Sequence, residues 1–348
     1  MNQTFTKRLQ KFFAFAGMTV LLLGLSSSLF AQDIHFSQFN FSPLNLNPAN
    51  AALFNGDARF AANYRNQWFN VPVNFNTFSA SADMPVYTLK NNDKIGAGVL
   101  FYYDRVGDSR FTSLQAMLSL SYILNFGQNN KHSLSAGFNA GVGNRSFQYQ
   151  YLYFDNQYNG DHYVPDLNSG ESFPSTNITY PEVGAGLAYQ FQLNDRKSVT
   201  VGFSMNHLNQ PKQSFFGEDG VKLNIRYTLN ARARWRVAKK LDIVPEFIFQ
   251  NQDTKHEIAF GMHTKAFVFK QRTAQVCLNT GVYYRNNDAL YFLVGMDYNN
   301  WQANVSYDVN VSRFNKATNT YGALEISVIY IMFKVKSVKS AGSGCPIL

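Results

Sequence analysis

The fold class is decided by residues 222–237, which read KLNIRYTLNARARWRV. Apolar and polar residues alternate along this whole stretch, which is typical of a β-strand because successive side chains of a strand point to opposite faces. One face carries Leu223, Ile225, Tyr227, Leu229, Ala231, Ala233, Trp235 and Val237. The stretch is longer than the roughly 5–6 residues of an ordinary globular strand. It fits the alternating segments of about 10 residues that cross a membrane as a barrel, with one face toward lipid and the other toward a polar lumen.

The same alternation recurs along the chain, for example in residues 114–125 and 301–312. Candidate strands lie near residues 57–68, 74–85, 93–104, 110–125, 131–146, 179–191, 197–208, 222–237, 240–250, 254–267, 272–285, 288–299, 301–312 and 321–336. Fourteen is an even number, which returns both ends of a barrel to the same side of the membrane.

The connections between these strands give an independent test of the count. If the first strand runs outward, every long connection falls on the outer side, as a bacterial barrel requires. We therefore expect an all-β fold: a transmembrane antiparallel β-barrel of about fourteen strands, with short periplasmic turns and longer extracellular loops. A soluble sandwich also alternates, but its strands are shorter. The longest loop, residues 147–178, is a candidate lid, plug or docking surface.

Composition excludes other classes of protein. Of 348 residues, 45% are hydrophobic and 16% aromatic, yet the mean hydropathy is −0.24 and only 15% are charged, against about 25% in a soluble domain. Membrane helices need about 20 consecutive apolar residues per span, and no such run follows the first thirty positions. Disorder is excluded by the many aromatic residues. The net charge of +9 is spread along the chain, which does not favour nucleic-acid binding.

The N-terminus predicts export. Lys7, Arg8 and Lys11 precede an apolar stretch at 12–25 and small residues at 26–31, which is the pattern of a signal peptide cleaved after Ala31. No cysteine stands directly after the apolar stretch, where a lipid anchor would be attached. We expect residues 1–31 to be the signal peptide, 32–56 a periplasmic N-terminal segment, 57–336 the outer-membrane barrel and 337–348 a periplasmic C-terminal tail.

No set of residues predicts catalysis, a metal or a cofactor. The six histidines are not clustered, so a barrel-embedded hydrolase lacks its nucleophile and base. His263 and Glu257 are expected in the lumen as ordinary polar residues. Acidic residues between 155 and 166 do not have the spacing of an EF-hand loop. Cys277, on the lumen face, and Cys345, in the tail, are interpreted as isolated thiols.

The highest local concentration of charge is the lumen-facing ladder Arg226, Arg232, Arg234 and Arg236. Arginines inside a barrel select anions or recognise carboxylates. The alternative is that they pair with lumen acids of other strands, such as Asp297, Asp308 and Glu325. Both interpretations stay open from the sequence.

Several segments resemble one known family. Residues 32–48 (QDIHFSQFNFSPLNLNP) and 64–68 (YRNQW) resemble the start of PorP/SprF proteins, which are outer-membrane proteins of the Bacteroidetes type IX secretion and gliding machinery. SYDVNVS at 306–312, GALEISVIY at 322–330 and the terminal Cys345-Pro346 resemble the end of that family. The resemblance implies a barrel that assists the export or surface attachment of large adhesins and other substrates with a C-terminal sorting domain, together with other secretion components.

The N-terminal segment and YRNQW supply the candidate partner-binding residues. These are His35, Phe36, Ser37, Gln38, Phe39, Asn47, Pro48, Arg65, Gln67 and Trp68. A free tail with so many aromatic residues would be prone to aggregation, so we expect the segment to fold into the periplasmic mouth, to bind a machinery partner or to plug the lumen. Tyr64 and Trp68 fit an aromatic girdle, whereas Arg65 and Gln67 would line the mouth where a substrate docks.

Together these observations predict a non-enzymatic outer-membrane accessory barrel of type IX secretion, embedded in outer-membrane lipid. The alternative is an outer-membrane channel or transporter for small or hydrophobic solutes.

Overall fold

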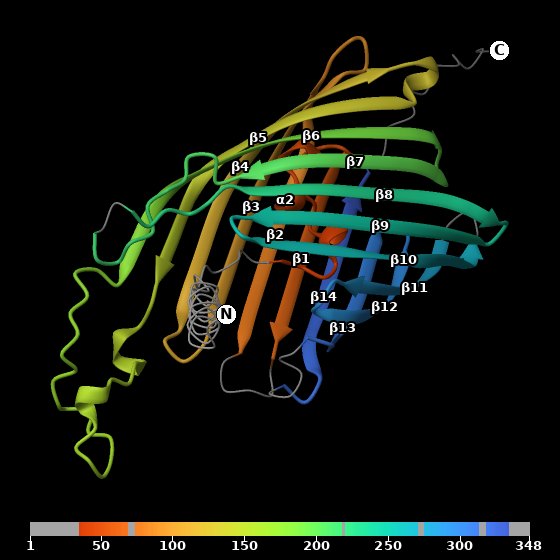
Figure 1. The fold of residues 1–348 in the computed structure, drawn as a ribbon. Coiled ribbons are helices and arrows are strands. Elements are labelled where there is room, and N and C mark those ends of the chain that lie inside the picture. Colours follow the sequence, from red (N-terminus) through yellow and green to blue (C-terminus); the bar gives the residue numbers. More distant parts are fainter. Residues whose placement is uncertain (1–34, 69–73, 218–219, 271–274, 313–317, 334–348) are drawn as a thin grey trace, which may run out of the picture. The chain divides into compact units, whose positions relative to one another are not determined.

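Fourteen strands close into a single antiparallel barrel in the part of the chain that the computed structural model describes, residues 35–68, 74–217, 220–270, 275–312 and 318–333 (Figure 1). Each strand pairs with its neighbours in sequence, and β1 closes the barrel against β14. The strands are β1 Ala58–Gln67, β2 Phe75–Thr88, β3 Lys94–Val106, β4 Phe111–Phe126, β5 His132–Ser146, β6 Asn177–Asn194, β7 Lys197–Asn206, β8 Arg226–Ala238, β9 Leu241–Gln252, β10 Lys255–Lys270, β11 Gln275–Arg285, β12 Ala289–Tyr298, β13 Trp301–Asn310 and β14 Tyr321–Met332. Each expected strand overlaps one of these, so the predicted fold class is confirmed.

The two ends of the barrel differ in the length of their connections. Short connections, 89–93, 127–131, 195–196, 239–240, 271–274 and 299–300, join the strands at one end, here called the turn end. The other end, here called the loop end, holds 68–74, 107–110, 147–176, 207–225, 253–254, 286–288 and 311–320. Figure 1 shows the 147–176 loop extending away from the strand ends.

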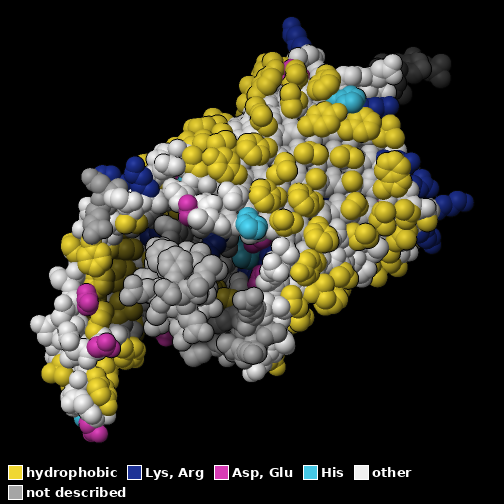
Figure 2. Space-filling view, viewed as in Figure 1, with side chains coloured by type: hydrophobic (Ala, Val, Ile, Leu, Met, Phe, Trp, Pro, Cys, Tyr) yellow, Lys and Arg dark blue, Asp and Glu magenta, His cyan; other side chains and the backbone are white. Residues whose placement is uncertain are grey.

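The alternation predicted from the sequence separates a polar inner face from an apolar outer face. In β8, Thr228 and Asn230 are buried, whereas Tyr227 and Leu229 are exposed. Along the outer face large apolar side chains are exposed in many strands, up to 66% for Leu118, and Figure 2 shows them spread over the barrel wall. This inverted pattern is that of a membrane barrel, whose outer face meets lipid. No helix within the described ranges is long and apolar enough to cross a membrane.

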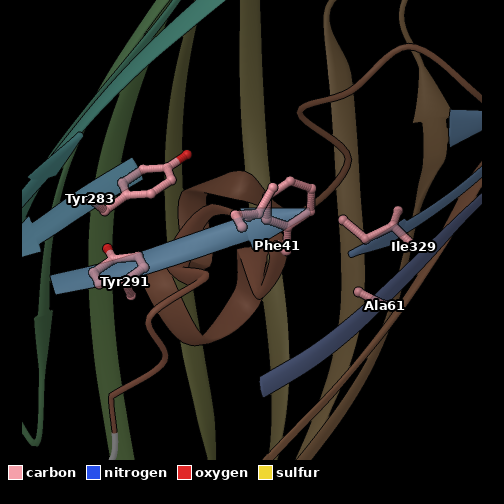
Figure 3. Close-up of a cluster of buried hydrophobic side chains, with 6 residues drawn as sticks. Phe41, Ala61, Tyr283, Tyr291 and Ile329 are labelled. Carbon is pink, nitrogen blue, oxygen red and sulfur yellow. The ribbon is translucent and has the colours of Figure 1, made fainter. Parts of the chain in front are cut away.

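Residues 35–54 fold inside the barrel and are called the plug below. They form a short helix, α2 (Pro43–Leu46), flanked by single 3-10 turns at Phe39–Phe41 and Pro48–Asn50. Each apolar cluster found among the described residues contains at least one plug residue. In the largest, Phe41 lies between Tyr283 and Tyr291 on one side and Ala61 and Ile329 on the other (Figure 3). The hydrophobic core is therefore an interface between plug and wall.

One boundary differs from the expected one in the stretch that decides the fold. The strand starts at Arg226 and not at residue 222, because β7 ends at Asn206, the register partner of Arg226. Residues 222 and 223 instead pair within their own loop. Lys222 forms a bridge with Lys212, and the Leu223 N–H donates to the Pro211 carbonyl at 2.9 Å. The apolar–polar alternation before Arg226 therefore belongs to this local pairing and not to β8.

Candidate functional site

The loop end of the plug is held by a buried carboxylate. Glu325, on β14 and fully buried, accepts the backbone N–H of Ser37 at 2.8 Å and that of Gln38 at 2.9 Å. The Gln38 side chain donates to the Ser306 hydroxyl at 3.0 Å and to the Glu325 carbonyl at 3.1 Å, and accepts from the Ser327 hydroxyl at 2.5 Å. Every polar group of Gln38's amide thereby has a partner on β13 or β14.

Two arginines complete this cluster. Arg65 of β1 donates to Glu325 at 3.1 Å and to Asp308 of β13 at 3.0 Å. Arg285, the last residue of β11, donates to the same Asp308 oxygen at 2.9 Å. The Ser37 hydroxyl lies between them, accepting from Arg65 at 2.5 Å and from Arg285 at 3.1 Å while it donates to Asp308 at 2.8 Å. Arg65, Arg285, Asp308 and Glu325 form what we call the clamp.

The turn end of the plug is held mostly by uncharged wall groups, with the ion pair Arg59–Asp83 at its last residues. Hydroxyls of three wall serines donate to plug carbonyls: Ser204 to Leu46, Ser135 to Ala49 and Ser121 to Ala51, at 2.9, 2.7 and 2.6 Å. The side-chain amide of Asn47, fully buried, donates to the carbonyls of Leu187 and Phe203 on β6 and β7 at 3.0 and 3.2 Å. Its oxygen accepts the Ala49 N–H at 2.8 Å and so caps the turn that follows.

Wall glycines make room for this part of the plug. A Cβ at Gly137 would overlap the plug backbone at Pro48 and Ala49, and one at Gly186 would overlap the Asn47 side chain. A Cβ at Gly96 would lie 2.6 Å from the Ala51 carbonyl oxygen. Glycine in a strand often marks such a close backbone approach. These serines, glycines and backbone carbonyls of β3 to β7 form what we call the seat.

The plug runs along the lumen from the loop end to the turn end. Its first described residue, His35, lies 3.4 Å from Glu257, near the loop-end start of β10. At the other end the Ala52 N–H donates to the Asp83 carboxylate at 2.7 Å. Arg59, near the start of β1, donates both to Asp83 and to the Asn50 carbonyl. The chain therefore crosses the barrel interior before its first strand begins.

The arginine ladder pairs with acids other than those expected. Arg232 contacts Glu246 at 3.1 Å and Arg234 contacts Asp242 at 2.8 Å, both on the adjacent β9. Asp297 instead binds Lys265 at 2.6 Å, and Asp308 and Glu325 belong to the clamp. Arg232 and Arg234 thus pair with lumen acids of another strand, as the second interpretation proposed. The three acids named as examples are not their partners, because cross-strand neighbours are the nearest groups in a sheet. Arg226 lies half-buried at the loop end of β8, and Arg236 is exposed at its turn end.

The remaining candidate residues are distributed between plug and rim. Phe36, Phe39 and Pro48 are buried in the plug. Gln67 accepts a hydrogen bond from Arg65 at 3.3 Å, and Trp68, just after β1, packs edge-on against Phe75. Arg65 faces the lumen as alternation predicts, but its partners are the protein's own plug and wall.

Other lumen groups form a second polar cluster without a metal-binding arrangement. The Tyr283 hydroxyl donates to Glu246 at 2.7 Å and lies 2.8 Å from His263. His263 thus pairs with Tyr283, whereas Glu257, which we grouped with it, contacts His35. Cys277 is buried on the lumen side. Among the described residues no three His, Cys, Asp or Glu side chains converge as metal ligands do. Cys345 and the residues expected to form the signal peptide (1–31) and the C-terminal tail (337–348) lie outside the described residues.

A sequence profile of the type IX secretion system membrane protein PorP/SprF matches residues 28–330. The chain belongs to the PorP/SprF family. The resemblance noted in the sequence is thereby confirmed, and the protein is a type IX secretion membrane protein with a β-barrel fold.

Four of the five segments that carry the PorP/SprF resemblance meet at the clamp. HFSQF supplies Ser37 and Gln38, and YRNQW supplies Arg65. SYDVNVS supplies Asp308, and GALEISVIY supplies Glu325. Arg285 was not singled out from the sequence. Its place in the sequence could have indicated a lumen position, because Arg285 continues the lumen-facing series of Cys277, Asn279, Gly281 and Tyr283.

Solved structures similar to this PorP/SprF protein are barrels. The toluene transporter TodX of Pseudomonas putida is 9% identical, with a TM-score of 0.49 over 83% of this chain and 92% of its own. The CymD monoaromatic hydrocarbon channel is also 9% identical, with a TM-score of 0.46 over 84% and 93%. For the KdgM porin the values are 11%, 0.34, 78% and 98%. Values this low carry no conclusion about function. No curated protein sequence matches the chain significantly.

Proposed function

We propose that the protein is a non-enzymatic outer-membrane accessory of type IX secretion, which assists the export or surface attachment of a large secreted partner such as an adhesin with a C-terminal sorting domain. Residues 1–31 are then a cleaved signal peptide, and the turn end and the tail at 337–348 face the periplasm. The observation that carries the proposal is the plug. Because the protein's own N-terminal segment occupies the lumen, held by the clamp at the loop end and by the seat and the Arg59–Asp83 pair at the turn end, a folded partner engages the barrel at its surface.

The loop 147–176 is the surface best suited to such a partner. Its base is fixed by aromatic contacts, since the Phe147 ring lies 5.0 Å from Phe173 and 4.9 Å from Phe215 of the neighbouring loop. Farther along, Tyr153 and Tyr158 are 74% and 56% exposed. Exposed tyrosines on a fixed base are characteristic of protein interfaces, where Tyr is enriched.

Capture of the partner from the outer membrane tests the proposal. A tagged full-length barrel, cross-linked in cells, should recover a large secreted protein, and the double variant Tyr153→Ser/Tyr158→Ser should recover much less of it. Loss of an interface hot spot costs at least about 2 kcal/mol, or roughly 30-fold in affinity. Tyr64→Ser/Tyr227→Ser is the matched control, because both side chains are exposed on the outer wall.

Three results would count against the accessory role. One is equal recovery of the partner by both double variants. Another is normal surface display of the partner in cells that lack the barrel. The third is recovery of the barrel alone, together with solute-dependent conductance of the purified protein in planar bilayers, which would support the channel alternative.

A further inference from the structure

The two ends of the barrel carry opposite charge. The turn-end connections contain six basic and two acidic residues, whereas the loop-end connections contain five basic and nine acidic residues. Figure 2 shows both sides of this division: Lys and Arg gather beyond the tips of β8 and β9, and acidic side chains lie along the projecting loop. The turn-end connections are therefore net positive and the loop-end connections net negative.

The turn-end charge is concentrated where β6, β7, β8 and β9 meet. Arg196, Lys197, Arg236, Lys239 and Lys240 form what we call the basic rim. Arg196 joins the two turns, since it donates to the Lys239 carbonyl at 2.7 Å and to the Ala238 carbonyl at 3.2 Å. These bonds fix the positions of the backbone that carries the two turn lysines.

Most of the rim's charge is not neutralised by the protein. Asp242 is fully buried and already binds both Arg196 and Arg234. Lys239, Lys240 and Arg236 are exposed, and within the described ranges no carboxylate lies in ion-pair contact with them. The rim thus presents uncompensated positive charge to solvent.

The basic rim adjoins the apolar belt of the barrel. Trp235 and Val237, on the outer face at the end of β8, are each 51% exposed. The Lys197 ammonium lies 4.7 Å from the centre of the Trp235 ring. Tryptophan with neighbouring Lys and Arg is the usual composition of a membrane–water interface. The charges therefore stand at headgroup level, directly beside the acyl-chain region.

We infer that the basic rim binds the anionic headgroups of phospholipids in the leaflet at the turn end. Its charge is complementary to a phosphodiester, and its surface is continuous with the face that lipid already covers. A basic residue near an anionic membrane surface contributes about 1 kcal/mol. The loop-end connections carry a net negative charge, so the rim would also favour one orientation of the barrel relative to an anionic leaflet.

Lipid titration of the purified full-length barrel tests this inference. The barrel in a neutral detergent is titrated with phosphatidylglycerol or phosphatidylcholine, and bound lipids are counted by native mass spectrometry. We expect tighter binding of phosphatidylglycerol. Lys239→Gln/Lys240→Gln should weaken that binding by about fivefold per lysine, or roughly 25-fold in total, whereas Lys239→Arg/Lys240→Arg should retain it.

The matched control is Lys222→Gln/Lys255→Gln, which removes the same charge from two exposed lysines at the loop end. Heat-modified gel migration verifies that every variant is a folded barrel. The inference is overturned if the wild type does not prefer phosphatidylglycerol, or if the control loses as much affinity as the rim variant. It is also overturned if the rim retains an acidic periplasmic protein but shows no lipid preference.

Discussion

Glu325→Gln should release the loop end of the plug and leave the barrel closed. One carboxylate oxygen accepts from the Ser37 N–H and Arg65, and the other accepts from the Gln38 N–H. An amide has only one oxygen, so in either orientation its NH₂ group faces another donor. The strand pairing of β14 with β1 and β13 uses backbone groups, so the wall keeps its ladder.

The size of the effect follows from the burial of the clamp. The plug donates two backbone hydrogen bonds to the Glu325 carboxylate. A hydrogen bond to a charged group contributes about 1.5–3 kcal/mol, and a neutral amide retains at most one of the two in weakened form, so seating of the plug should lose about 3–5 kcal/mol. At about 1.4 kcal/mol per tenfold change, the opening equilibrium of the plug should rise by roughly 100-fold to several thousand-fold. Ser37→Ala keeps both backbone donors and loses one hydroxyl, so its effect should be smaller, about 1.5–3 kcal/mol.

Hydrogen–deuterium exchange of the solubilised full-length barrel measures this opening. Amides at residues 37–42 should exchange faster in both variants, in the order Glu325→Gln above Ser37→Ala, while strand amides remain protected. Glu171→Gln, in the exposed loop, is the control and should resemble the wild type. If residues 37–42 keep wild-type protection in Glu325→Gln, the clamp does not hold the plug.

Three further perturbations examine the seat, a turn and the direction of the plug. Gly137→Ala places a Cβ on the plug backbone and should destabilise the seated plug by about 1–3 kcal/mol. Faster proteolysis within residues 35–54 measures this effect. Gly220→Ala is the control, because a Cβ there has open space and should leave the proteolysis rate unchanged. Hydrogen bonds from the Asn125 N–H and the Tyr122 hydroxyl lower the pKa of Asp93 in the 89–93 turn. The ionised carboxylate therefore stabilises the turn at any pH above the unfolded pKa of about 4. This stabilisation is lost as the pH falls through the lowered pKa of Asp93. Amide protection measured over a range of acid pH should therefore show a step, and Asp93→Asn should abolish it. In a background without native cysteines, His35→Cys should react with a membrane-impermeant maleimide from the loop side and Asn299→Cys only from the turn side; the opposite result would reverse the assigned direction of the plug.

Alternation predicted the barrel and the direction of most lumen side chains, because a one-residue shift would move each strand's apolar face to the wrong side. It placed Arg65, Asp308 and Glu325 on the lumen side. It did not predict that they meet, because their proximity depends on closure of β1 against β14 and on a plug residue 288 positions from Glu325. The role of Arg285 was not predicted either, because its contacts with Ser37 and Asp308 also depend on the closed barrel and on the plug.

The seat was less predictable than the clamp. Ser121, Ser135 and Ser204 are ordinary lumen residues of an alternating strand, and only the path of the plug gives their hydroxyls an acceptor. The path of the plug follows from the turns at Pro43 and Pro48. The arrangement of these turns in space cannot be predicted from the sequence, because the segment has no apolar–polar periodicity. The N-terminal motif predicted a bound segment; it did not specify where the segment binds.

The two attachments of the plug respond to different perturbations. At the clamp the plug offers only neutral groups to charged wall residues, namely the Ser37 hydroxyl and the N–H groups of Ser37 and Gln38. A carboxylate or guanidinium of a partner can compete with them, because a contact between two charged groups is stronger than a hydrogen bond from a neutral one. The seat consists of shape and neutral hydrogen bonds, for which a charged group is no substitute. We therefore expect a partner at the loop end to displace residues 35–40 first, while residues 44–54 stay seated and keep the turn end closed. Such a barrel would change its loop face on binding a partner without opening a path across the membrane.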